Sequence, residues 1–233
     1  MNRFRAYLGL CILLTIAYIA SGCSIGDKNL ADQVKPPEIG EEILVIETEY
    51  GVIKARMFNE LAPQACQGVK RLVQAGFYKN KSIDRLEKDF LFQVNQKDQS
   101  EYQETPLVLE STKELKHYKG ALGLARTRDS NVEGFDNLVH SFYIIAPSQI
   151  EDEYLSALKN LNDDTLTDLQ LATYKEMGGV PRLDGEYTIF GQVFEGLEVL
   201  DRINDMVANA SIDHSIWDEG ILLKSIEIVQ YDK

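Results

Sequence analysis

The chain has 233 residues, of which 37 are acidic and 24 are basic, so its formal net charge is −13. A surface with this excess of negative charge repels phosphate backbones, which excludes nucleic acid from the expected partners. About 190 residues follow the N-terminal region, enough for one domain with its own core.

The first part of the chain has the order of a secretory leader. Arg3 and Arg5 precede an apolar run over residues 6–20, which is too short for a typical transmembrane helix. Ser21-Gly22-Cys23 follow and resemble the lipobox of bacterial lipoproteins, which implies cleavage of residues 1–22 and a lipid on Cys23. A plain cleaved signal is the alternative. We expect residues 23–40 to form a flexible tether and the protein to lie in the cell envelope, anchored to the outer membrane or a periplasmic face.

Cysteines and histidines give no pattern of a metal or redox centre. Cys11 leaves with the predicted leader, so Cys66 remains alone beside the anchor and is expected to be a core residue. The histidines lack the spacing of zinc ligands, and they are His117, His140 and His214. We therefore expect no metal, no cofactor and no disulfide.

Short strands dominate the rest of the chain. The apolar stretches 43–46 and 52–58 flank Gly51, a pattern typical of a hairpin. Helical spacing predicts one helix after Pro63 and a second over residues 197–206. Further strands are expected at 90–94, 120–126, 142–146, 187–193 and 221–230. This order predicts a closed antiparallel barrel that is capped at its ends.

One segment, residues 150–177, does not fit the barrel pattern, because its leucines recur at helical spacing beside acidic residues. We expect it to be a helical insertion in one barrel loop. An amphipathic insertion should pack its apolar face on the barrel and leave its acidic face exposed.

Four sequence blocks together carry a family resemblance. They are Leu61-Ala62-Pro63 with Gly76-Phe77-Tyr78, Ile83-Asp84-Arg85 through Phe90-Leu91-Phe92-Gln93, 119–126 with 141–144, and 178–193. In this order they resemble the cyclophilin-type peptidyl-prolyl cis-trans isomerases, in a bacterial lipoprotein form. The resemblance implies a mainly β fold over residues 41–233: a closed eight-stranded antiparallel β-barrel with two capping α-helices and the helical loop insertion.

The resemblance also implies an activity and a site. The family rotates the amide bond before proline, whose uncatalysed barrier is about 18–20 kcal/mol. No covalent bond changes, so a hydrogen-bond donor near the proline nitrogen and an apolar pocket are needed. By the resemblance Arg85 is that donor, since a guanidinium is always charged. The implied substrate-binding residues are Phe90, Leu91, Gln93, Arg126, Ser141, Tyr143, Tyr187 and Phe190. Proline-containing polypeptides are the expected partners of a monomer.

Three departures from the family pattern leave the activity open. They are Ile83-Asp84 in place of Phe-His, Val94-Asn95-Gln96 in place of Gly-Gly-Asp, and His140-Ser141 in place of Ser-Gln. We expect an isomerase of reduced activity on exported or surface polypeptides. The alternatives are a non-catalytic proline-peptide-binding or chaperone module with the same fold, and a structural lipoprotein that binds no peptide. On the last reading Arg85 is an ordinary surface arginine and the aromatic residues are ordinary core.

Overall fold

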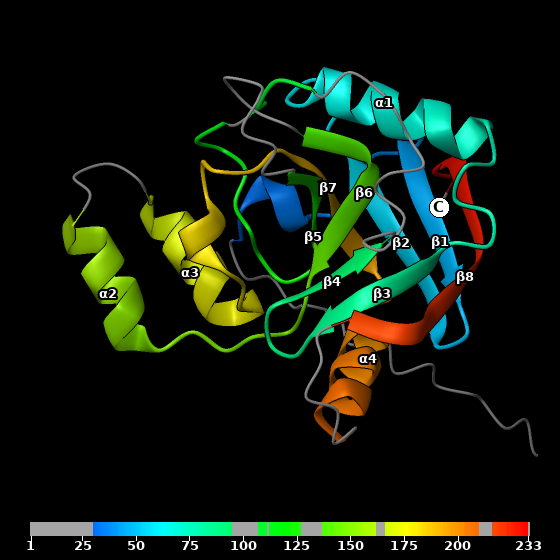
Figure 1. The fold of residues 1–233 in the computed structure, drawn as a ribbon. Coiled ribbons are helices and arrows are strands. Elements are labelled where there is room, and N and C mark those ends of the chain that lie inside the picture. Colours follow the sequence, from blue (N-terminus) through cyan, green and yellow to red (C-terminus); the bar gives the residue numbers. More distant parts are fainter. Residues whose placement is uncertain are drawn as a thin grey trace, which may run out of the picture.

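Eight antiparallel strands close into a barrel in the computed structural model, which describes residues 30–94, 107–110, 112–126, 137–161, 166–209 and 216–232. Their order around the barrel is β1-β2-β7-β5-β6-β4-β3-β8 (Figure 1). The strands are β1 (Glu42–Thr48), β2 (Gly51–Met57), β3 (Ser82–Glu87), β4 (Leu91–Val94), β5 (Ala121–Arg126), β6 (Asn137–Ile145), β7 (Ile189–Glu195) and β8 (Ile216–Gln230). This confirms the closed eight-stranded antiparallel barrel predicted from the sequence.

Two helices cover the ends of the barrel, as predicted. Figure 1 shows α1 (Pro63–Gln74) at the top and α4 (Leu197–Asn209) at the bottom. Each turns one apolar face inward, and the buried apolar side chains are Ala65, Cys66, Val69 and Leu72 in α1 and Val199, Leu200 and Ile203 in α4. Burial raises the pKa of the Cys66 thiol to about 12, so this cysteine is a core side chain and a poor nucleophile.

Alternation along the strands divides the side chains between two clusters. Inward-facing residues such as Phe92, Leu122 and Phe142 are fully buried in the barrel core. Their neighbours along β4, β5, β6 and β7 point outward and form a second group, which we call the outer cluster. Its members are Phe58, Leu91, Leu115, Ala121, Tyr143, Ile145, Val180, Leu183 and Ile189, with Leu61, Phe90 and Tyr187 packed at its edge.

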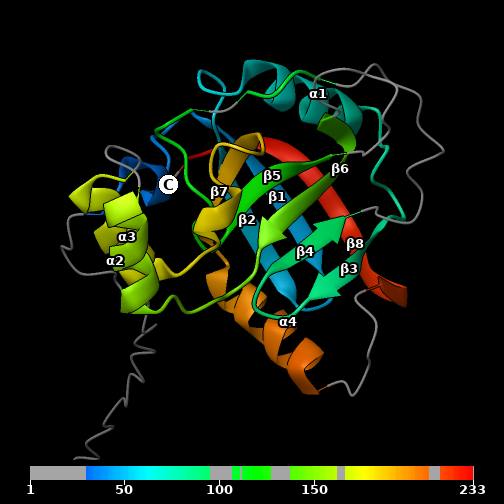
Figure 2. The ribbon, with the colours of Figure 1, turned by 60° about the vertical axis from the view of Figure 1, so that its left-hand side comes forward.

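The predicted insertion forms α2 (Asp152–Leu161) and α3 (Asp168–Met177), in the connection between β6 and β7. Both views place these helices beside the barrel wall, away from the end that α1 covers (Figures 1 and 2). A capping box starts α3, because Thr167 and Gln170 bond each other's backbone N–H. Tyr174 of α3 packs on Tyr118 with ring centroids 4.5 Å apart, so the insertion joins the body of the domain. A short 3-10 helix, η3 (Pro181–Leu183), leads back to β7.

The described part of the predicted tether, residues 30–40, differs from the expectation. Its short helix η1 (Asp32–Val34) lies against the domain, and Ala31 is buried. Gln33 donates to the carbonyl oxygen of Lys116 (2.7 Å) and to the side chain of Gln192 (3.0 Å), and accepts from the Lys116 N–H (2.8 Å). A buried amide with these partners anchors the segment. A flexible tether over all of residues 23–40 is therefore wrong: the ordered domain includes residues from position 30 onward.

The leader, Cys23 and the start of the tether lie outside the described residues, so their predicted roles stay predictions. Within the described ranges, no helix has the length and apolar character needed to cross a membrane.

Candidate active site

A row of five residues crosses the outer face of the barrel. In adjacent strands Arg85 pairs with Gln93, Gln93 with Tyr143, Tyr143 with Gly123, and Gly123 with Ile189. Directly opposed residues in antiparallel strands project from the same face of the sheet. The barrel therefore brings three predicted site residues, Arg85, Gln93 and Tyr143, side by side, although 58 positions of the printed sequence separate the first from the last.

Arg85 begins this row and is held by two partners. Its Nη1 donates to Gln93 Oε1 (2.9 Å), and its Nε donates to Glu87 Oε1 (2.7 Å), with which its Nη2 also forms an ion pair. Glu87 is two residues along β3 and so lies on the same face. About a third of the arginine side chain is exposed (30%). The carboxylate that engages Arg85 is thus Glu87; the neighbouring Asp84 is buried at an irregularity in the β3 pairing.

Gln93 is fixed by a chain of hydrogen bonds that involves Ser141. Gln93 Nε2 donates to Ser141 Oγ (3.0 Å), and Ser141 Oγ donates to the carbonyl oxygen of Val94 (2.9 Å). These bonds turn the amide oxygen of Gln93 toward Arg85. Ser141 has no exposed surface, so the prediction that it contacts substrate is wrong. Its hydroxyl is committed inside the protein, where it orients Gln93.

The apolar part of the site is the rim of the outer cluster. Leu91, Tyr143 and Leu183 are buried members of the outer cluster at this place, and Phe90 and Tyr187 pack half-buried at its edge. Four of these are predicted site residues. The fifth, Leu183, is not among the residues predicted from the sequence. Its place in the turn-rich block 178–193 could have indicated it, because a large apolar side chain in a surface loop usually packs against an apolar partner.

Two arginines flank this apolar part. The guanidinium carbon of Arg182 lies 4.4 Å from the ring centroid of Phe90, and that of Arg126 lies 5.5 Å from the ring centroid of Tyr187. Arg126 Nη1 also donates to the carbonyl oxygen of Glu186 (2.8 Å). The structure therefore places Arg126 at the edge of the site, where it packs on Tyr187 by a cation-π contact.

Phe190 is the second predicted substrate contact that the structure corrects. It follows Ile189, which belongs to the outer cluster, so alternation turns Phe190 into the barrel. There it is fully buried and meets Phe142 edge to face, with centroids 5.8 Å apart. Phe190 is a core residue.

Gly123 makes room for the tyrosine of the row. A Cβ at position 123 would lie 2.3 Å from both Cζ and Oη of Tyr143, so the ring lies directly over the glycine. Burial raises the pKa of Tyr143 well above its ordinary value, and Tyr187 and Asp184 add to the shift. The hydroxyl is therefore protonated across the physiological range.

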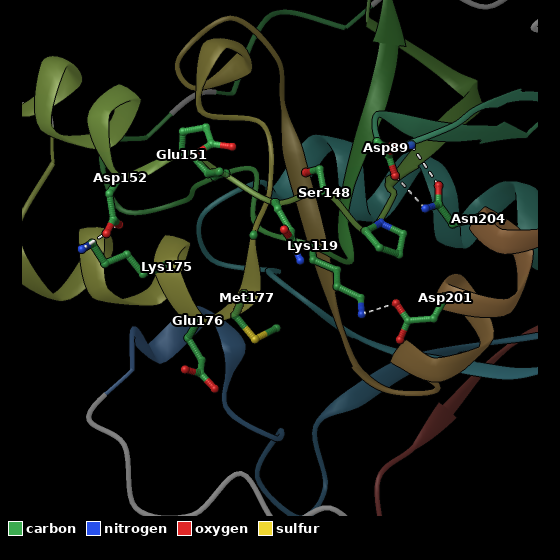
Figure 3. Close-up of a pocket in the computed structure, with 14 residues that line it drawn as sticks. Asp89, Lys119, Ser148, Glu151, Asp152, Lys175, Glu176, Met177, Asp201 and Asn204 are labelled. Carbon is green, nitrogen blue, oxygen red and sulfur yellow. Dashed lines mark hydrogen bonds and ion pairs between the residues drawn. The ribbon is translucent and has the colours of Figure 1, made fainter. Parts of the chain in front are cut away.

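A separate polar groove lies between the insertion and α4. Its volume is about 960 Å³, and Figure 3 shows its lining side chains. Lys119 pairs with Asp201 (2.6 Å), and Lys175 pairs with Asp152 (2.8 Å). The residues of the cross-strand row do not line it. In the described part of the chain, no three His, Cys, Asp or Glu side chains gather as metal ligands would.

A closed barrel with an arginine, a glutamine and an aromatic cluster on one outer face places a charged hydrogen-bond donor beside an apolar surface. The family model for cyclophilin type peptidyl-prolyl cis-trans isomerase/CLD matches residues 43–228. The chain belongs to this family.

Relatives with known descriptions agree with this assignment. A Staphylococcus saprophyticus protein assigned to the peptidyl-prolyl cis-trans isomerases is 28% identical over 201 residues, or 82% of this chain and 94% of that protein. The isomerase cypE of Dictyostelium discoideum is 27% identical and covers 72% of this chain and 88% of its own length. A solved cyclophilin-type isomerase of Cryptosporidium parvum shares the fold, with a TM-score of 0.54 at 23% identity, and covers 81% of this chain and 99% of its own.

Proposed function

We propose that this domain rotates X-Pro bonds in exported or surface polypeptides, and that it does so more slowly than an unimpeded site would. The observation that carries the proposal is the alignment of Arg85, Gln93 and Tyr143 beside an apolar cluster on one face of the barrel. The related Cryptosporidium parvum isomerase was solved in the presence of the dipeptide Ala-Pro, which supports a proline-containing ligand here.

The proposed mechanism requires no covalent step. As the X-Pro bond twists, amide resonance is lost and the proline nitrogen becomes a better hydrogen-bond acceptor. Arg85 can donate to that nitrogen from its partly exposed guanidinium, while the proline ring packs on the apolar rim formed by Phe90, Leu91 and Leu183. A preorganised donor of this kind typically lowers a barrier by about 3–4 kcal/mol. Gln93 limits the motion of the guanidinium through its 2.9 Å hydrogen bond.

Glu87 supports the proposal of a reduced rate. Its carboxylate occupies Nε and Nη2 of Arg85, so these donors must leave it, or share with it, before they can serve a substrate. A partly exposed ion pair contributes roughly 0.2–1 kcal/mol, which corresponds to a rate penalty of less than about tenfold. The same pair is the observation that favours the second candidate function, a module that binds proline segments without turning them over.

Export and membrane attachment are proposed from the sequence alone. Ser21-Gly22 before Cys23 fit a lipidated cysteine, which would hold the domain at a membrane of the cell envelope. Replacement of Cys23 by serine should then release the protein into the soluble fraction or leave its leader uncleaved. Unchanged membrane association of Cys23→Ser would refute the anchor.

Turnover separates the two candidate functions. The exchange rate of a short Ala-Pro peptide is measured in a coupled-protease assay with wild type, Arg85→Ala and the control Arg202→Ala, an arginine of α4 that bonds the carbonyl oxygen of Tyr50. Arg85→Ala should lose most of the activity, by about 3 kcal/mol in the barrier, and Arg202→Ala should keep it. A wild type that binds the peptide by calorimetry but leaves its spontaneous exchange unchanged would establish the binding module instead.

A further inference from the structure

A buried chain of polar side chains runs from the insertion to the active site. Tyr174 of α3 donates to Asp184 Oδ2 (2.7 Å), and Asp184 Oδ1 lies 2.9 Å from His117 Nδ1. His117 Nε2 in turn lies 2.9 Å from the hydroxyl of Tyr143. We call these four residues the polar chain. The imidazole of His117 has no exposed surface, and three of the four residues play no part in the mechanism described above.

Hydrogen-bond accounting fixes the protons in the polar chain. Asp184 faces three donors, because the backbone N–H of His117 also donates to its Oδ1 (2.8 Å), and an ionised carboxylate accepts from all three. Burial raises the pKa of Tyr143 and of Tyr174 well above the ordinary value, so both hydroxyls are protonated. Every proton finds an acceptor when His117 carries its hydrogen on Nδ1 and accepts the Tyr143 O–H at Nε2.

This arrangement determines where the Tyr143 hydroxyl points. Its hydrogen is directed to His117, and its ring lies over Gly123, where no Cβ opposes a shift of the ring. An apolar cluster by itself does not select one position for a ring above such a gap, whereas a hydrogen bond to a buried, immobile partner does.

The backbone around the polar chain is equally constrained. Val180 N–H donates to the carbonyl oxygen of His117 (2.8 Å). Gly179 has φ +140°, and a Cβ there would lie 2.2 Å from the same carbonyl oxygen, so this close approach requires glycine. The loop that carries Leu183 and Asp184 is thereby tied to His117.

We propose that His117 and Asp184 are positioning residues that hold the Tyr143 ring in the proline site, and that Tyr174 makes the insertion helix α3 the far support of this arrangement. This inference rests on the proposed proline-binding function and assigns the insertion a role in it. The competing possibility is that the polar chain only satisfies buried polar groups and so contributes to stability alone.

Substitution at the far end distinguishes the two possibilities. Tyr174→Phe removes one hydroxyl that makes no contact with the site, and Tyr118→Phe is the matched control in the same cluster, outside the polar chain. If the polar chain positions Tyr143, Tyr174→Phe raises KM for an Ala-Pro peptide roughly threefold and Tyr143→Phe roughly tenfold, within the range of coupling in one hydrogen-bond network. The double variant then shows no more than the Tyr143→Phe effect. Tyr118→Phe, which also removes one buried hydroxyl, leaves KM unchanged.

A wild type that turns over the peptide, with the same KM in Tyr174→Phe, overturns the inference and leaves the proposed function intact. Additive effects in the double variant overturn it as well. If turnover is absent, the dissociation constant of the peptide, measured by calorimetry, takes the place of KM, because a displaced Tyr143 ring weakens binding whether or not the bond rotates. Absence of peptide binding would refute both the proposed function and this inference.

The proton assignment has a test of its own. A ¹⁵N NMR spectrum of His117 near neutral pH should show hydrogen on Nδ1 and none on Nε2. Hydrogen on Nε2 would contradict the proton assignment.

Discussion

At the Arg85 half of the site, Arg85 and Glu87 are partly exposed and are held by residues close in sequence, whereas at the Tyr143 half the side chains are mostly buried and come from four separate segments. Arg85 contacts Glu87 and Gln93, both within eight positions of it. Tyr143 depends on His117 directly and on Asp184 and Tyr174 beyond it. In the Arg85 half, the charge of Glu87 alone can change how available the guanidinium is to a substrate. In the Tyr143 half, the position of the ring is fixed by packing between distant segments of the domain. Substitutions in the two halves should therefore fail in different ways.

The largest effect is expected at Gly123, in the buried half. A Cβ at position 123 would lie 2.3 Å from Tyr143 Cζ, and the ring is held by His117, so it cannot retreat freely. Gly123→Ala should lower the free energy of unfolding by about 1–3 kcal/mol, as overpacking does, and should also raise KM. Chemical denaturation measures the first quantity. In a Tyr143→Ala background the clash is gone, and Gly123→Ala should then cost much less; an equal cost in both backgrounds would contradict this account.

Ser141→Gln tests the border between the two halves. From the sequence alone, a glutamine at this position is expected to raise the rate by restoring a bond to the substrate backbone. The structure predicts the opposite, because Ser141 has no exposed surface and its hydroxyl links Gln93 to Val94. Overpacking should destabilise Ser141→Gln by about 1–3 kcal/mol and release Gln93 from Arg85. Ser141→Ala, which removes the link without adding volume, should cost about 1 kcal/mol. A faster and equally stable Ser141→Gln would restore the sequence-based expectation.

The difference between the halves also explains what the sequence could predict. The barrel and its two capping helices follow from strand alternation and helical spacing, which are local patterns. Arg85 and Gln93 follow from the resemblance of residues 83–93 to the family's strand pair. Glu87 lies in the same stretch of sequence, but its ion pair with Arg85 can be predicted only once both residues are known to lie on the same face of β3.

The remaining residues are set by packing between distant segments. The resemblance assigns Ser141 to the substrate, and no local pattern shows that the side chain is buried beside the paired strands β4 and β6. The resemblance likewise assigns Phe190 to the substrate, and its inward direction follows only once Ile189 is known to point outward, which no local pattern reveals. His117 was considered only as a metal ligand, since its partners Asp184 and Tyr143 are 67 and 26 positions away. The docking of Gln33 on the domain was missed for the same reason.

The smallest effect is expected at Glu87, in the exposed half, and its sign is the informative part. Glu87→Gln keeps the shape of the side chain but removes the charge that holds Nε and Nη2 of Arg85. An exposed pair of this kind contributes roughly 0.2–1 kcal/mol, so stability should hardly change, while kcat/KM for an Ala-Pro peptide should rise up to about fivefold as the guanidinium becomes available. The increase should shrink in high salt, which already weakens the pair in the wild type. Glu60→Gln, an exposed residue outside the site, is the matched control and should leave the rate unchanged. A lower rate in Glu87→Gln would mean that the carboxylate aims Arg85 at the substrate, and the exposed half of the site would then be as preorganised as the buried half.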